Sequence, residues 1–233
     1  MKRAEKLEEF AGGMKAMAPL TVAVMPIGLV FGAVAASKGL SSLEVLLMSA
    51  LVFAGGSQFV AMDIWKHPAS WGALAFSALL VNIRHVLMSA SIGTKMPAFS
   101  GPAKYAAMLL LADEIWAMAE LRAERTRLTP AWYAGLAIPF YCVWVLASLA
   151  GSIVGALLGD PNVVGLDFAF PAVFTVLVMG FWKGRETGAV LAASALAAVL
   201  AHQLLPGAWY IAAGAAAGVV ATLLTGRRRE VCA

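Results

Sequence analysis

Five strongly polar side chains lie near the middle of two apolar stretches of this sequence. The first stretch contains Asn82, Arg84 and His85, and the second contains the adjacent acids Asp113 and Glu114. An ionisable group in an apolar environment is unfavourable unless it is paired or hydrated, so its presence there indicates a function by default. A guanidinium binds carboxylates, whereas a carboxylate or an imidazole binds ammonium groups or carries protons. These residues are therefore candidates for a site that binds a charged solute or transfers protons.

Helical spacing limits how these five residues can pair. Asn82 and His85 share one helix face and Arg84 lies on another, so this helix should be central in its bundle. Asp113 and Glu114 point about 100° apart, so one can neutralise Arg84 while the other stays free. Burial favours a neutral carboxyl and a nearby cation favours the carboxylate, which makes the free acid the better proton carrier. Two interpretations stay open: a structural ion pair that fixes helix register, or a proton or substrate-ammonium site at one acid or at His85.

Glycine and proline interrupt two further apolar segments, at Ala-Gly-Gly-Ser-Gln (54–58) and Phe-Ala-Phe-Pro (168–171). Such residues weaken or kink helices, and the freed backbone groups must be buried in protein or line a cavity. Side chains and amides at the first break could bind a carboxylate, or the glycines could only permit close packing. The candidate substrate-binding or proton-coupling residues are Gly55, Gly56, Ser57, Gln58, Asn82, Arg84, His85, Asp113, Glu114, Phe170 and Pro171.

Sequence motifs of several enzyme classes are absent. The chain has no GxxxxGK[ST] nucleotide loop, no HExxH zinc motif and no GxSxG nucleophile elbow. An intramembrane hydrolase that pairs Ser57 with His85 or His202 stays a formal alternative. We expect no enzymatic activity, no metal and no cofactor.

The composition indicates a membrane protein. Hydrophobic residues make up 61% of the 233 residues and charged residues 13%, with a mean hydropathy of +0.83, whereas a soluble domain has roughly 25% charged residues. Apolar stretches of about 20 residues match the length of a membrane-spanning helix. We predict an all-α, polytopic transmembrane bundle of seven or eight spans in a single transporter domain (1–233). The candidate spans are about 19–36, 43–64, 71–92, 105–121, 131–158, 162–182, 187–205 and 208–225.

Lysine and arginine positions predict an orientation, because cytoplasmic loops are enriched in them. With eight spans, an amphipathic lead-in (1–18) and a basic tail (226–233), both termini are cytoplasmic in a bacterial inner membrane. The outer side then holds Lys38, Lys95 and Lys104, and Arg84 lies mid-span. The cytoplasmic side holds Lys2, Arg3, Lys6, Lys15, Lys66, Arg122, Arg125, Arg127, Lys183, Arg185, Arg227, Arg228 and Arg229.

Two parts of the chain are loosely alike. Spans one to three and five to seven each have an early proline, Pro26 or Pro139, then Gly-xxx-Gly spacing, then a broken second span. Matching broken helices in two halves often locate a transporter's substrate site. Eight crossings make the halves parallel, whereas seven would invert them, and residues 165–171 could begin a re-entrant segment instead of a crossing.

Four strings resemble the AzlC (BrnF, YgaZ) family, the large subunits of two-component branched-chain amino-acid exporters. They occur in the family's order and spacing, and the resemblance covers roughly residues 15–225. The strings are PIGLVFGAVAASKGLSSLEVLLMSALVFAGGSQFVA (26–61), VNIRHVLMSAS (81–91), ADEIWAMA (112–119) and GLDFAFPAVF (165–174).

The resemblance implies secondary-active export of leucine, isoleucine and valine, and in some members methionine or analogues, together with a small AzlD-type membrane subunit. It marks Gly55 to Phe59, Asn82, Arg84, His85, Asp113, Glu114 and Gly165 to Pro171 as family hallmarks. The family often has alanine beside the first glycine, whereas this chain has Gly-Gly-Ser, which leaves substrate size open.

The mechanism we expect is alternating access, with the zwitterion between broken spans two and six. Its carboxylate would meet helix-terminal amides or Arg84, and its ammonium Asp113 or Glu114. The alternatives are a membrane scaffold or assembly subunit that does not transport, or a permease component for another small zwitterionic solute.

Overall fold

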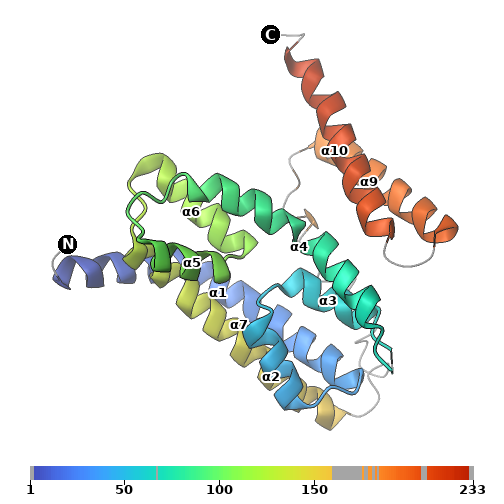
Figure 1. The fold of residues 1–233 in the computed structure, drawn as a ribbon, viewed down its shortest axis with the longest axis horizontal. Helices are drawn as coiled ribbons and strands as arrows, with labels where there is room; N and C mark the ends of the chain where they lie inside the picture. The colour runs from blue at the N-terminus through green and yellow to red at the C-terminus, as the bar shows by residue number, and fades with distance from the viewer. Residues whose placement is uncertain are drawn as a thin grey trace. The chain divides into compact units, whose positions relative to one another are not determined.

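The computed structural model describes residues 3–66, 68–158, 184–205 and 209–230, and the single positions 175, 178, 179 and 182. Within these residues the secondary structure is helical throughout, and four helices (α1, α4, α7 and α9) are long and apolar enough to cross a membrane. The predicted helical membrane class is therefore confirmed. The helices are α1 (Arg3–Ser37), α2 (Ser42–Leu51), α3 (Gly55–Asp63), α4 (Trp71–Gly93), α5 (Gly101–Leu109), α6 (Asp113–Arg125), α7 (Pro130–Leu158), α9 (Arg185–Leu204) and α10 (Trp209–Glu230) (Figure 1).

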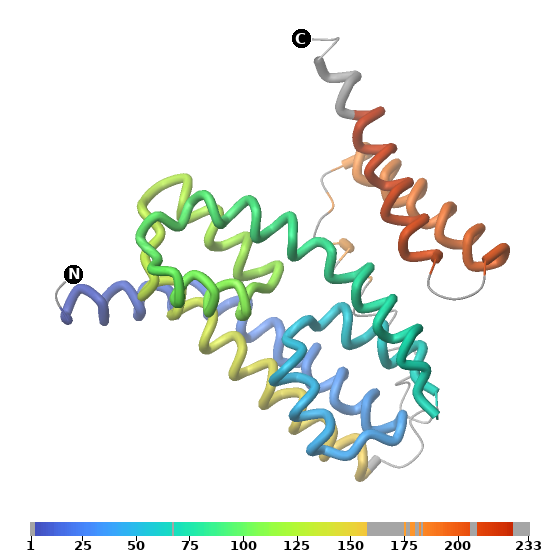
Figure 2. Tube along the Cα trace, in the orientation of Figure 1, coloured from blue at the N-terminus to red at the C-terminus, as the bar shows by residue number. Residues whose placement is uncertain are grey.

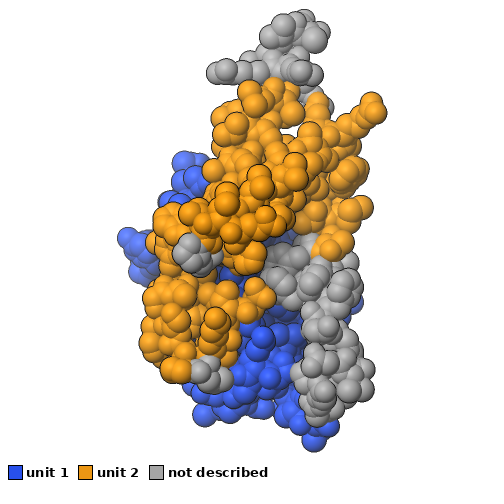
Figure 3. All heavy atoms as spheres, turned by 90° about the vertical axis from the view of Figure 1, so that its right-hand side faces the viewer, with its two compact units in different colours: residues 1–62, 82–169 blue, residues 63–81, 170–233 orange. Residues whose placement is uncertain are grey.

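The chain divides into two compact units (Figure 3). Unit 1 comprises residues 1–62 and 82–169, and unit 2 comprises residues 63–81 and 170–233. Helix α4 begins in unit 2 and ends in unit 1. The candidate residues that the structure describes all belong to unit 1.

Helices α1 and α7 run parallel and form the centre of unit 1. Their backbones touch where glycines replace side chains: a Cβ on Gly13 would lie 2.1 Å from the Trp132 carbonyl oxygen, and one on Gly32 would lie 1.9 Å from that of Ser148. The residue numbers of the contacting positions increase together along both helices, so the two helices run in the same direction. The small-residue spacing in the sequence thus lets two spans approach more closely than side chains would allow.

The predicted span 43–64 consists of two short helices with a turn between them. A capping box begins α2, because Ser41 and Glu44 bond each other's backbone N–H groups. Within the break at residues 52–54, Phe53 lies edge-on to Tyr141 at 5.1 Å, and after it Phe59 of α3 meets Phe31, near the C-terminal end of α1, at 5.5 Å. Helix α3 therefore returns toward the end of unit 1 at which α2 began (Figure 2).

The expectation of one continuous helix over 105–121 is wrong. Helix α5 ends at Leu109 and α6 begins at Asp113. The physical reason is the pair of adjacent carboxylates, Asp113 and Glu114. These groups are stabilised by the positive end of a helix dipole, and the break places both in the first turn of α6.

Helix α6 runs parallel to the second half of α4, since Arg84 pairs with Asp113 and Lys95 pairs with Glu120. The Lys104 ammonium donates to the Gly93 carbonyl oxygen at 2.7 Å, so α5 starts where α4 ends. Both ends of the segment 94–129 thus lie at the same end of unit 1. The expectation that Lys95 and Lys104 lie on the opposite side of the membrane from Arg122, Arg125 and Arg127 is therefore wrong.

Unit 2 contains an antiparallel pair, α9 and α10. A Cβ on Gly214 would meet Ala198 at 3.2 Å, and one on Gly218 would meet the Ser194 hydroxyl at 2.5 Å. An aromatic contact of 5.1 Å between Phe76 and Trp209 joins the first half of α4 to α10.

Candidate functional site

Arg84 of α4 and Asp113 of α6 form an ion pair, with 2.7 Å between Nη1 and Oδ2. Of the two adjacent acids, Asp113 is therefore the one that pairs with Arg84. The side chains are 42% and 38% exposed in this chain, so the pair borders accessible space instead of a closed core. It is also located where the α5–α6 backbone breaks, because Asp113 is the first residue of α6.

Glu114 follows Asp113 in the first turn of α6, and its carboxyl group interacts electrostatically with both Arg84 and Asp113. Within the described part of the chain, Glu114 forms no ion pair. The Ala112 N-cap contributes no side-chain hydrogen bond to the first amides of α6. The helix start therefore presents one acid outside the ion pair beside backbone amides that the N-cap side chain does not satisfy.

Three buried polar atoms on α4 lack hydrogen-bond partners among the described residues. They are Asn82 Oδ1, Arg84 Nε and His85 Nδ1. The His85 ring lies near Arg84 and Asp113 and faces the backbone of Leu111 in the α5–α6 break. Buried polar atoms are nearly always hydrogen-bonded, so the unpaired Arg84 and His85 nitrogens beside Asp113 suit a ligand that brings hydrogen-bonding groups of its own.

Gln58 forms hydrogen bonds across the break between α2 and α3. Its side chain is fully buried; Nε2 donates to Ser49 Oγ at 3.2 Å, and Oε1 accepts from Trp144 Nε1 at 3.0 Å. A Cβ on Gly55 would lie 3.0 Å from the Trp144 ring, so this glycine permits the indole to pack against the start of α3. Gln58 thus joins α2, α3 and α7, and tight packing accounts for Gly55.

The sequence-predicted candidates separate into two clusters. Arg84, His85, Asp113 and Glu114 come together where α4 meets the start of α6, and Asn82 precedes His85 by about one turn of α4. The first turn of α3, residues 55–58, forms a second cluster around Trp144. Phe170 and Pro171 lie outside the described residues.

Sequence analysis missed a second link between α4 and α6. Glu120 forms an ion pair with Lys95 and accepts a hydrogen bond from Ser91. The spacing in the sequence was consistent with this link. Ser91 follows Arg84 by seven residues and Glu120 follows Asp113 by seven, and positions seven residues apart recur on the facing sides of parallel helices. The Lys95–Glu120 pair requires Lys95 to lie near the C-terminal half of α6, which the predicted orientation excludes.

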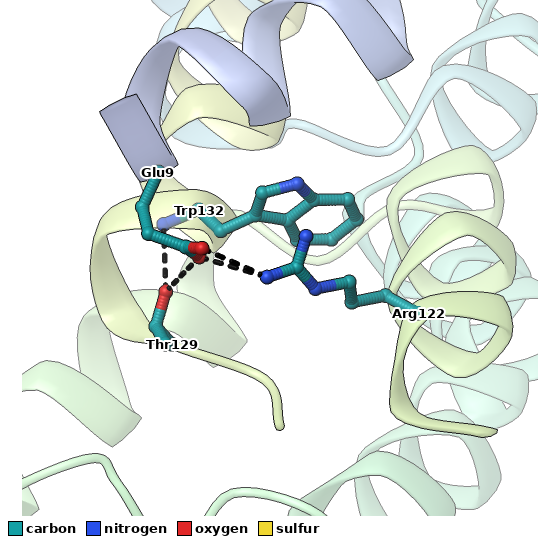
Figure 4. Close-up of polar contacts among 4 residues, drawn as sticks. All are labelled: Glu9, Arg122, Thr129 and Trp132. Carbon is teal, nitrogen blue, oxygen red and sulfur yellow. Dashed lines mark hydrogen bonds and ion pairs between the residues drawn. The ribbon is translucent and has the colours of Figure 1, made fainter. Parts of the chain in front are cut away.

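A third ion pair fixes the C-terminal end of α6 (Figure 4). Arg122 Nη2 lies 3.0 and 2.9 Å from the two carboxylate oxygens of Glu9, and the Thr129 hydroxyl donates to Glu9 at 2.7 Å. The guanidinium also lies over the Trp132 ring, 4.9 Å from its centroid. Side chains of α1 and α7 therefore hold one end of α6 and Arg84 holds the other.

Within the described residues, no three His, Cys, Asp or Glu side chains gather as metal ligands would. The cluster at Arg84 is consequently a set of charged and hydrogen-bonding groups. Its chemistry suits a small solute that carries both a carboxylate and an ammonium group.

Comparisons with known proteins identify a family and several related membrane proteins. A family model described as AzlC protein matches residues 19–158. An uncharacterized membrane protein of Archaeoglobus fulgidus is 30% identical over 88% of this chain and 90% of its own length. The inner membrane protein YgaZ of Escherichia coli is 29% identical over 79% and 78%. The branched-chain amino acid transport protein AzlC of Bacillus subtilis is 24% identical over 79% and 72%. No solved structure matches.

Proposed function

The chain belongs to the AzlC family, and from this premise we propose that it is the large subunit of a secondary transporter that exports branched-chain amino acids. The substrates in this proposal are leucine, isoleucine and valine, with methionine or analogues as further cargo. A small AzlD-type membrane subunit is the partner. The complex operates in the bacterial inner membrane with both termini of this chain in the cytoplasm.

Two observations support a role in membrane transport. A relative is named as an amino-acid transport protein. The described residues contain four helices long and apolar enough to cross a membrane. Export and the preference for branched side chains belong to the proposal itself.

The observation that carries the proposal is the Arg84–Asp113 ion pair at a helix break, with Glu114 beside it. A zwitterionic amino acid needs a cation for its carboxylate and an anion for its ammonium group. Arg84 and the uncapped amides of α6 supply the first, and Glu114 supplies the second. Because Asp113 already pairs with Arg84, the substrate carboxylate competes with Asp113 for the guanidinium.

Proton coupling follows from the same arrangement. When Glu114 is protonated it no longer attracts an ammonium group, so proton and substrate exclude each other at this acid. Such exclusion is what antiport requires, with protons entering as amino acids leave. An apolar pocket discriminates by only about 1–3 kcal/mol per methylene, so we expect several aliphatic amino acids to be accepted.

Efflux measurements test the proposal. Cells that express this chain with an AzlD-type subunit and are loaded with labelled leucine should lose the label faster than cells with empty vector. Equal retention would favour the scaffold interpretation, in which the charged residues are purely structural.

A further inference from the structure

The segment between α4 and α7 has both its ends at one end of unit 1. At the start of the segment, Lys95 pairs with Glu120. At its end, Thr129 and Arg122 both bond Glu9 of α1, at 2.7 and 2.9 Å. The loop after α4 and the loop before α7 therefore lie together, beside the N-terminal part of α1.

Neither helix of this segment is long enough to cross a membrane. Helix α5 has 9 residues and α6 has 13, whereas a spanning helix needs about 20. Six of the thirteen residues of α6 are charged, so its surface does not suit lipid. A re-entrant hairpin of two short helices that lies against α1, α4 and α7 satisfies both constraints, because interrupted backbone is tolerated in membranes where it lies against protein or lines a cavity.

We propose that α5–α6 is a re-entrant hairpin that enters the membrane from the cytoplasmic face and forms the inner gate to the Arg84 site. The common side of its two ends follows from the contacts above, whereas the cytoplasmic assignment and the gating role rest on the proposed function. Lysine and arginine gather at the ends of the hairpin: Lys95 precedes it, Lys104 lies in the first turns of α5 and Arg122 in the last turn of α6, as expected beside cytoplasmic loops.

Helices α2 and α3 form a second hairpin, whose open end faces the opposite end of unit 1 from that of α5–α6. It starts and finishes toward the C-terminal end of α1, whereas α5–α6 starts and finishes toward the N-terminal end of α1. Each hairpin follows a long helix, α1 or α4, and turns at a break within the unit. This inverted relation matches transporters whose substrate site is located between broken helices and opens to each side in turn.

The way in which α6 is held suits a moving part. Its described ion pairs, to Arg84, Lys95 and Glu9, join side chains that are 14% to 42% exposed. Each of these contacts joins the ends of two side chains, so it can break and re-form without repacking of a helix backbone. By contrast, α1 and α7 pack through glycine contacts between backbones, which resist movement. The hairpin can therefore swing while the α1–α7 pair stays fixed.

Cysteine accessibility tests the proposal without any transport readout, so its failure is distinguishable from failure of the proposed function. In a Cys142→Ser, Cys232→Ser background, single cysteines replace Ser100 before α5, Thr126 after α6, or Lys38 between α1 and α2, all three exposed. A membrane-impermeant maleimide is applied to intact cells and to inverted vesicles. Labelling in detergent controls for the presence of each variant.

The proposal predicts that S100C and T126C react in inverted vesicles and lose their reaction in intact cells, while K38C behaves in the opposite way. Reaction of S100C and T126C from opposite sides would overturn the hairpin, because α5–α6 would then cross the membrane. Reaction of both from the outer side would overturn the cytoplasmic entry.

Discussion

Arg84 and Asp113 are joined at 2.7 Å although 29 positions separate them, and the contact depends on the chain breaking just before Asp113. An ion pair at this depth has two possible roles. It can hold α4 and α6 in register, or it can be the resting state of a substrate site. The two roles predict different behaviour when the charges are removed together.

Neutralising one partner should be more harmful to folding than neutralising both. Arg84→Gln or Asp113→Asn leaves an unpaired charge, whereas the double variant leaves none. We expect the double variant to insert and fold better than either single variant and yet to lose leucine export. Size-exclusion profiles in detergent and efflux assays measure the two properties.

Arg125→Gln is the matched control, because Arg125 is exposed at the end of α6. It should change neither folding nor export. A double variant that exports at the normal rate would limit the Arg84–Asp113 pair to a structural role.

Glu114→Gln should uncouple transport from the proton gradient without unfolding the protein, because Glu114 lies outside the ion pairs among the described residues. We expect gradient-driven accumulation in vesicles to be lost while leucine–leucine exchange persists. Glu124→Gln, an exposed acid on the same helix, serves as the control. Undiminished gradient-driven transport in Glu114→Gln would exclude the coupling role.

Gln58→Leu should destabilise the fold. It leaves the buried Ser49 hydroxyl and Trp144 indole N–H without their partner, which costs about 1–3 kcal/mol for each unsatisfied group. For a chain of this size we expect the melting temperature to fall by roughly 2–4 °C per kcal/mol. A double-mutant cycle with Trp144→Phe isolates the contact. A variant that melts normally but fails to transport would instead make Gln58 a substrate ligand.

Gly32→Ala should lower the melting temperature because the new Cβ would lie 1.9 Å from the Ser148 carbonyl oxygen. Gly72→Ala in α4 is the control, since nothing lies within 4 Å of the added carbon. Alanine favours a helix by about 1 kcal/mol over glycine, so Gly72→Ala should be neutral or stabilising. Equal effects at both positions would contradict the close α1–α7 contact.

Hydropathy was sufficient to predict the membrane class, because burial of apolar side chains in lipid depends on composition over about 20 residues. The pairing of Arg84 with one of two acids was also foreseeable, since a mid-span charge needs a partner. The choice of Asp113 was not, because it depends on the α5–α6 break. An averaged hydropathy window does not detect a break inside an apolar segment, although adjacent acids at a helix start were a local signal for it.

The hydrogen bonds of Gln58 illustrate a different limit of prediction from sequence. Its partner Trp144 is 86 positions away, and the two meet only because α3 turns back against α7. The glycines at 55 and 56 were read as a site for backbone binding or close packing, and nothing in the sequence alone distinguishes these uses. Register between distant helices has to come from tertiary structure.

Transport by the purified components is the most direct test of the central claim. This chain and an AzlD-type subunit, reconstituted together in proteoliposomes, are given labelled leucine and an imposed proton gradient. We expect gradient-dependent movement of leucine that disappears in the Arg84→Gln, Asp113→Asn double variant and persists in Arg125→Gln. Absence of leucine movement in the unmodified complex, or equal movement in the double variant, would contradict it.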